Sequence, residues 1–267
     1  MNAFFDQFNA QQHNLDTALC VGLDPDINRL PACIRNSDKP IFEFNKAIVD
    51  ATSDLVCCYK PQIAYYASCG AEAELEMTIA YIKDKGVPVL LDAKRGDIGS
   101  TAEHYARELF DRYGADAITV NPYMGFDSFE PYLAYEDKAV FLLCRTSNPG
   151  GADLQNLRLE NGKALYEQVA ELAAGEWNRN GNIGLVVGAT NPDELARIRE
   201  ITGDMTFLVP GIGAQGGDIA AVMAAGQGGH MILSSSRAVL YASADTDFAA
   251  AARTVAEATV REINEQK

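Results

Sequence analysis

Short apolar segments that alternate with helical segments are the feature that most constrains the fold of this chain. Because each segment is apolar throughout, both faces of each expected strand should be buried, as in a parallel sheet covered by helices. Eight segments have the length and the branched side chains of buried strands. They cover residues 17–23, 55–59, 87–91, 117–120, 139–144, 184–188, 207–209 and 230–233.

The number of strand–helix units favours a closed barrel. A further helix is expected to begin at a cap on Ser100 or Thr101 and to run to Tyr113. Eight units predict an α/β fold, a single-domain (β/α)8 barrel over residues 1–267, and the 48% hydrophobic content suits one large core. An open, doubly wound sheet is the alternative. Helical spacing also appears at residues 41–52, 71–85 and 248–265.

The composition limits which partners the chain is expected to bind and in which cellular compartment it is expected. The formal net charge of −15 argues against binding to nucleic acid or to an anionic membrane surface. No segment approaches the roughly 20 apolar residues of a membrane span, and the N-terminus lacks the pattern of a signal peptide. The six cysteines form no Cys-x-x-Cys pair, so neither a zinc site nor a disulfide framework is expected. We therefore expect a cytoplasmic protein without a metal site.

The densest group of charges follows the third expected strand. Asp92 and Lys94 are two residues apart, so on an extended chain their side chains point to the same side. Asp97 comes next, where Gly96 lets the chain turn. The structural alternative is a salt-bridged strand end at the surface.

Other strand ends add to this group, because β/α barrels build their active sites at the carboxyl ends of the strands. Lys60 follows the second expected strand, and adjacent strands lie about 4.8 Å apart, so Lys60 can touch Asp92 and Lys94. Each lysine then has a carboxylate neighbour that keeps it charged. The long polar loop of residues 147–162 lies at the same face and is expected to act as a lid. The remaining strand ends carry Asp24, Asn121, Ser147, Gly211 and Arg237.

A glycine-rich segment at residues 209–218 predicts an anion site. Its glycines let backbone N–H groups approach an anion at a helix N-terminus, and Arg237 follows the eighth strand. Loops after strands seven and eight form the recurrent phosphate site of such barrels. The Gly-x-Gly-x-x-Gly spacing also matches a dinucleotide pattern, but Ser236 stands where a Rossmann site needs an acidic residue. A glycine turn that is packed closely for steric reasons is the structural alternative.

These motifs resemble the orotidine 5′-phosphate decarboxylase family. The pattern Asp-x-Lys-x-x-Asp-Ile-x-x-Thr at residues 92–101, with Lys60 one strand earlier, is similar to the signature of that family. Residues 121–125 and the long loop after the fifth strand resemble the subgroup of longer bacterial enzymes. The resemblance spans the chain and includes residues 22–25, 59–62, 146–150, 210–218 and Arg237.

The resemblance implies cofactor-free decarboxylation of orotidine 5′-phosphate to uridine 5′-phosphate, the last step of de novo pyrimidine synthesis. Lys94 would be the cation beside the reacting carbon and the proton donor, held by Asp92 and Lys60. Asp97 would lie near the departing carboxylate. The resemblance also implies a homodimer with shared active sites, in which Asp97 and Thr101 come from the partner subunit.

Further contacts to this nucleotide follow from the same resemblance. Asp24 and Lys60 would contact the ribose, and Ser147 would bond to the pyrimidine edge. The pyrimidine contacts around Asn121 and Tyr123 stay open, because this subgroup departs there from the shorter members. The phosphate side would be formed by Pro210, Gly213, Gln215 and Arg237.

Two other functions stay open. A Mg²⁺-dependent sugar-phosphate aldolase or decarboxylase of the same barrel superfamily uses a related Asp-x-Lys-x-x-Asp motif. Lys60 and Ser147 argue against it, and insensitivity to a chelator would separate the two activities. A regulatory barrel that binds a phosphorylated ligand would bind nucleotide tightly without turnover.

Overall fold

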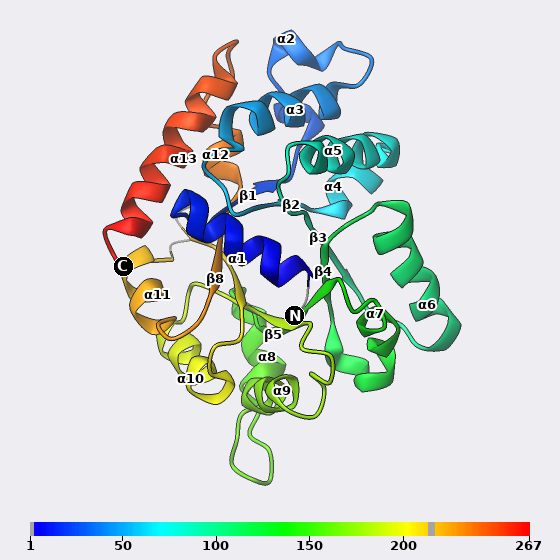
Figure 1. Cartoon of the computed structure of the whole chain (residues 1–267), viewed down its shortest axis with the longest axis vertical. Coiled ribbons are helices and arrows are strands. Elements are labelled where there is room, and N and C mark those ends of the chain that lie inside the picture. Colours follow the sequence, from blue (N-terminus) through cyan, green and yellow to red (C-terminus); the bar gives the residue numbers. More distant parts are fainter. Residues whose placement is uncertain (1–2, 213–216) are drawn as a thin grey trace.

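A barrel of eight parallel strands forms the centre of the computed structural model, which describes residues 3–212 and 217–267 (Figure 1). The strands are hydrogen-bonded in the order β2-β1-β8-β7-β6-β5-β4-β3. Bridges between Tyr59 and Val89 and between Gln62 and Asp92 join the two ends of this sheet, so the barrel closes between β2 and β3. The closed barrel is confirmed and the open sheet is wrong. The strands are β1 Leu19–Leu23, β2 Cys58–Pro61, β3 Leu90–Arg95, β4 Ala117–Val120, β5 Ala139–Arg145, β6 Ile183–Val187, β7 Phe207–Pro210 and β8 Met231–Ser235.

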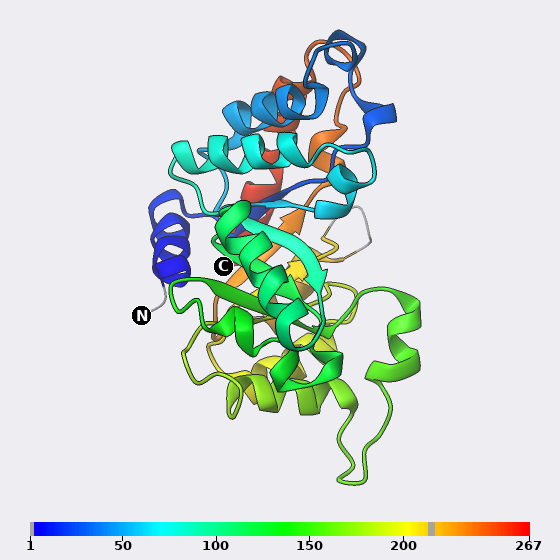
Figure 2. The same cartoon turned by 90° about the vertical axis from the view of Figure 1, so that its right-hand side faces the viewer.

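Helices surround the barrel, as the two views at right angles show (Figures 1 and 2). Within the described ranges, none is long and apolar enough to cross a membrane. The larger helices are α1 Ala3–Leu15, α3 Pro40–Thr52, α5 Glu72–Asp84, α6 Gly99–Arg107, α9 Leu165–Ala174, α10 Pro192–Thr202, α11 Ile219–Ala225 and α13 Phe248–Asn264. The shorter ones are α2 Ala32–Arg35, α4 Ile63–Ala67, α7 Glu130–Leu133, α8 Ala152–Gln155 and α12 Arg237–Leu240.

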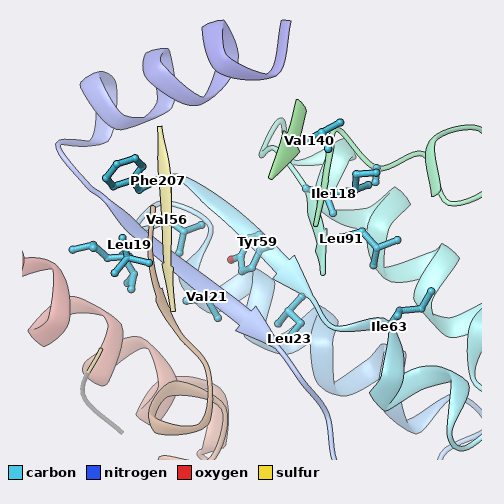
Figure 3. Packing of buried hydrophobic residues seen from close by; sticks show 14 of the residues in the cluster. Leu19, Val21, Leu23, Val56, Tyr59, Ile63, Leu91, Ile118, Val140 and Phe207 are labelled. Carbon is cyan, nitrogen blue, oxygen red and sulfur yellow. The ribbon is translucent and has the colours of Figure 1, made fainter. Parts of the chain in front are cut away.

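Both faces of the strands are buried, as their uniform apolar character predicts. Figure 3 shows Leu19, Val21 and Leu23 of β1 in the cluster that lies between the strands and the surrounding helices. Cys20, between them in sequence, belongs to a second cluster inside the barrel, with Phe141. Successive side chains of a strand point to opposite faces, so one strand supplies both clusters.

The helix α1 covers the barrel end from which the strands start (Figures 1 and 2). Phe4 and Phe8 are buried in the inner cluster, and the ring of Phe4 meets that of Phe141 edge to face at 6.0 Å between centroids. Gln12 also donates to the carbonyl of Met231 at 2.7 Å. The sequence analysis did not predict this helix. Its inward side chains are buried only because several strands, distant in sequence, meet at this end of the barrel. The helix segment itself does not carry that information.

Several strands extend further than the apolar segments predict, and in β2 and β3 the extension includes charged residues. The predicted strands ended at residues 59 and 91, but β2 continues to Pro61 and β3 to Arg95. Lys60, Asp92 and Lys94 therefore lie within the strands and not after them. Asp92 pairs with both lysines and Asp24 also faces Lys60, so these charged side chains can stay in the sheet at its carboxyl end.

The helix after β3 begins differently from the prediction. Ile98 is the residue that precedes α6, and no side chain caps the helix. Ser100 and Thr101 lie inside its first turn, so the predicted cap is wrong. The helix also changes to a π-helical turn at Glu108–Arg112 before Tyr113. Glu108 receives the guanidinium of Arg95 at 3.1 Å, which ties this turn to the end of β3.

Candidate active site

A cavity of about 490 Å³ opens at the carboxyl ends of the strands. Asp97 and Thr101 do not line it, and Gly213 and Gln215 lie outside the described residues. The predicted site residues that line it come from six strands or the loops that follow them. They are Asp24, Lys60, Asp92, Lys94, Ser147, Pro210 and Arg237.

Lys60, Asp92 and Lys94 form a continuous ion network on the wall of this cavity. The Nζ of Lys94 lies 2.6 Å from one carboxylate oxygen of Asp92, and the Nζ of Lys60 lies 3.4 Å from the other. Lys60 also faces Asp24, at 3.9 Å. The predicted contact between the ends of β2 and β3 is therefore present.

Burial and neighbouring charges shift the pKa values of these groups in opposite directions. Burial alone would lower the pKa of Lys60, but the carboxylates of Asp24 and Asp92 outweigh it and raise that pKa. Burial would raise the pKa of Asp92, but Lys60 and Lys94 lower it from 3.8 to about 2. Both side chains are thus ionised at neutral pH. A buried carboxylate between two ammonium groups fixes the position of both cations.

Lys94 has an unusual backbone conformation. Its φ is +47°, in the left-handed region, which costs a residue with a side chain about 1–3 kcal/mol. The pairing of β3 with β4 shifts at the same place, where Leu91 pairs with Ile118 but Arg95 pairs with Val120. Such strain persists only where surrounding contacts hold it, and it is typical of functional sites.

Thr119 in the neighbouring strand β4 holds this part of β3, and the sequence analysis missed it. Its hydroxyl donates to Asp92 at 2.7 Å and accepts the backbone N–H groups of Ala93 and Lys94, both at 3.0 Å. Thr119 also lines the cavity. The available signal was a hydroxyl residue within an apolar strand next to the strand that carries the charges.

A polar network holds the chain around Ser147. The Nε of Arg145, at the end of β5, lies 2.7 Å from Glu194 of α10. Gln155 of α8 accepts the backbone N–H of Thr146 at 2.9 Å. These contacts fix the two residues that precede Ser147, which lines the cavity.

Gly188 lies against the same segment. A Cβ at position 188 would stand 2.7 Å from the backbone nitrogen of Ser147, closer than real Cβ atoms approach. The chain after β6 therefore leaves room for Ser147 only because residue 188 has no side chain.

The predicted phosphate end of the cavity carries Pro210 and Arg237. Arg237 begins α12, directly after β8 and Ser236. At the start of α11, Asp218 accepts the N–H groups of Ala220 and Ala221. Two N–H groups at that helix terminus thus already have an acceptor. Among the described residues at this end, Arg237 supplies a cation to the cavity lining.

Asp97 and Thr101 lie outside the lining of their own chain's cavity. Asp97 accepts the next backbone N–H, that of Ile98, at 2.8 Å. Thr101 lies on the exposed side of α6, in a shallow groove with His104. Ile98 and Tyr123 are exposed nearby, with 56% and 75% of their surface accessible.

Comparisons with known proteins agree with this geometry. Residues 17–254 match the family described as Orotidine 5′-phosphate decarboxylase / HUMPS family. The chain is 62% identical over 266 residues to the orotidine 5′-phosphate decarboxylase of Dechloromonas aromatica, covering 98% of each chain. It is 59% identical to that of Ralstonia nicotianae, covering 99% of each.

Solved structures give the same result. The chain superimposes on the OMP decarboxylase of Leishmania donovani with a TM-score of 0.84 and 41% identity, covering 99% of this chain and 98% of that one. The putative orotidine 5′-phosphate decarboxylase of Streptomyces avermitilis gives a TM-score of 0.85 and 32% identity, with 100% and 96% covered. By its eight-stranded barrel, its cavity-lining ion network and these full-length relatives, the chain belongs to the orotidine 5′-phosphate decarboxylase family.

Proposed function

We propose that the chain decarboxylates orotidine 5′-phosphate to uridine 5′-phosphate in pyrimidine biosynthesis, without a cofactor. The ion network on the cavity wall, in which buried Lys60 and Asp92 hold the accessible Lys94, carries this proposal. The full-length relatives favour it over the sugar-phosphate aldolase of the same superfamily. A single-domain chain with a cytoplasmic location stays part of the proposal.

The chemistry requires a cation beside C6 of the pyrimidine. The bond from C6 to the carboxylate carbon breaks, CO₂ leaves, and the electron pair stays on C6 without a conjugated group to accept it. The ammonium group of Lys94 attracts that charge, and the attraction grows as the carbanion forms. Lys94 then gives a proton to C6 and regains one from solvent. Asp92 and Lys60 hold Lys94 in place.

The remaining cavity residues are proposed to bind the nucleotide. Asp24 lines the cavity, and its carboxylate can accept a hydrogen bond from a ribose hydroxyl. Lys60 would contact the same sugar, and Ser147 would bond to the pyrimidine edge. The phosphate would be held by Pro210, Gly213, Gln215 and Arg237.

The proposed dimer completes the site with Asp97 and Thr101 of the partner subunit. Their position away from their own cavity supports this arrangement, as do the exposed apolar side chains of Ile98 and Tyr123 beside them. Two unit charges about 4 Å apart interact by about 4 kcal/mol at an effective dielectric near 20. Repulsion between Asp97 and the substrate carboxylate, relieved when CO₂ leaves, would be of that order.

The test is to add orotidine 5′-phosphate to the purified protein, with and without EDTA. We expect the ultraviolet absorbance of the conjugated carboxylate to disappear at the same rate in both samples, with uridine 5′-phosphate as product. Loss of turnover on chelation, with turnover of a sugar phosphate, would favour the Mg²⁺-dependent aldolase. Tight nucleotide binding without any product would favour the regulatory barrel.

A further inference from the structure

The hydroxyl of Thr119 is the point where the site residues of β3 are joined to β4. It contacts the carboxylate of Asp92 at 2.7 Å and the backbone nitrogens of Ala93 and Lys94 at 3.0 Å each. Thr119 is 1% exposed, so water does not compete for these contacts. None of the roles proposed above includes this residue.

The two backbone contacts mark a break in the regular strand next to Lys94. In a regular strand successive N–H groups point to opposite sides, so one acceptor cannot receive both. Because Thr119 accepts the N–H groups of both Ala93 and Lys94, β3 leaves the regular strand conformation at Ala93, directly before the left-handed φ of Lys94. Over this stretch β3 advances four residues, from Leu91 to Arg95, while β4 advances two. In a regular pair of strands, backbone carbonyl groups accept the N–H groups. Where the register of β3 and β4 shifts, the hydroxyl of Thr119 accepts the N–H groups of Ala93 and Lys94 instead.

The donor and acceptor capacity of a hydroxyl fixes the direction of the third contact. A hydroxyl has one hydrogen to donate and two lone pairs to accept with. The N–H groups of Ala93 and Lys94 occupy both lone pairs, so the hydrogen points to Asp92. The same oxygen of Asp92 accepts the Nζ of Lys94 at 2.6 Å. Thr119 thus holds Lys94 at two places, at its backbone and through the carboxylate that binds its ammonium group.

We propose that Thr119 is a positioning residue for decarboxylation, whose hydroxyl sets where the ammonium group of Lys94 stands relative to the reacting carbon. The inference rests on the proposed function, in which Lys94 acts on the substrate. A one-ångström displacement of a catalytic group is costly, because the group must meet charge that develops at a fixed place. The hydroxyl should therefore affect the chemical step more than substrate binding.

The test compares Thr119→Val, which keeps the shape and removes the hydroxyl, with Thr119→Ser, which keeps the hydroxyl. We expect Thr119→Val to lower kcat about ten- to a hundredfold, the range for a hydrogen bond to a charged group. KM and the Kd of uridine 5′-phosphate should change less than about threefold, and Thr119→Ser should restore most of kcat. Thr119→Ala and Thr119→Ser form a second pair that differs only in the hydroxyl, should the valine variant not fold.

Thr202→Val is the matched control. The hydroxyl of Thr202 is also buried and bonds to the carbonyl of Ile198 in α10, outside the cavity lining. Its loss should leave kcat unchanged. An unchanged kcat in folded Thr119→Val, or a weaker Kd at unchanged kcat, would overturn the positioning role while leaving the proposed function intact. An inactive wild type would instead reject the proposed function itself.

Discussion

Lys94 combines a strained backbone with a partly accessible side chain. Its φ lies in the left-handed region, its Nζ is bound to Asp92, and 45% of the side chain is exposed. A side chain with that exposure contributes little to the core, so its chemical role can be tested without loss of the fold. Asp92 is the opposite case, because it is buried and ionised.

Lys94→Ala should abolish turnover and leave the fold intact. The change removes both the cation beside C6 and the proton donor, and a positioned acid alone contributes about 10²–10⁴-fold. Steady-state kinetics and circular dichroism measure the two properties. Lys85→Ala is the control, since Lys85 forms an exposed ion pair with Asp50 away from the cavity. A Lys94→Ala enzyme with more than a tenth of wild-type kcat would show that Lys94 is not the proton donor.

Asp92→Asn should destabilise the protein most at neutral pH. The folded-state pKa of Asp92, about 2, lies below the ordinary value of 3.8. Its ionised form therefore stabilises the wild type above about pH 4, and this contribution is lost as pH falls toward 2. The linked free energy is about 2 kcal/mol. Urea unfolding measures the free energy of unfolding of wild type and variant at pH 7 and pH 3. The difference between the two proteins should be smaller at pH 3, and an equal difference at both pH values would contradict the lowered pKa of Asp92.

The strand β5 and the segment after it show how one element places a site residue. Arg145 pairs with Glu194, Gln155 holds the backbone of Thr146, and Gly188 leaves the space for Ser147. Gln155 follows β5 in the chain, whereas Gly188 and Glu194 follow β6. Their contacts together determine where Ser147 lies, and they form only in the folded barrel.

Gly188→Ala should displace Ser147 and weaken substrate binding. The new Cβ would stand 2.7 Å from the backbone nitrogen of Ser147, so one of the two segments must move. We expect kcat/KM to fall at least about tenfold, mostly through KM, since an overpacked position typically costs about 1–3 kcal/mol. Gly150→Ala is the control in the same segment, because its nearest neighbour would lie at 3.6 Å. Equal kinetics for the two variants would contradict this steric argument.

The strands could be predicted from sequence because their apolar segments carry the signal locally. All eight are present, and β4 has the predicted bounds. The polar ends of β2 and β3 could not be predicted as strand, because their stability depends on ion pairs between Lys60 and Asp92 across the sheet. Thr119 was missed for the same reason, since its three partners lie on the neighbouring strand.

At the scale of the whole molecule, the sequence located the charged residues of one cavity. Seven predicted site residues line it, although they are spread from Asp24 to Arg237. The barrel topology makes this possible, since the carboxyl ends of all strands meet at one face. Asp97 and Thr101 do not line it, and the proposed dimer would bring them to the substrate of the partner subunit.

Mixing two inactive variants tests that arrangement. In a hybrid of Lys94→Ala and Asp97→Ala chains, one site carries both defects and the other carries neither. Random exchange makes about half of the dimers hybrids, so activity should recover to roughly a quarter of wild type. Differently tagged chains verify the exchange. A mixture of Lys94→Ala with Lys60→Ala should recover nothing, because both lysines belong to one chain's site. No recovery in the first mixture would reject the shared site.

The helix α1 has a consequence for the order in which the protein assembles. It is synthesised before all eight strands, yet Phe4 packs on Phe141 of β5 and Gln12 bonds to Met231 of β8. Its binding surface is complete only when the eighth strand has been translated. The helix therefore reaches these partners late, and this end of the barrel is covered only after β8 has formed.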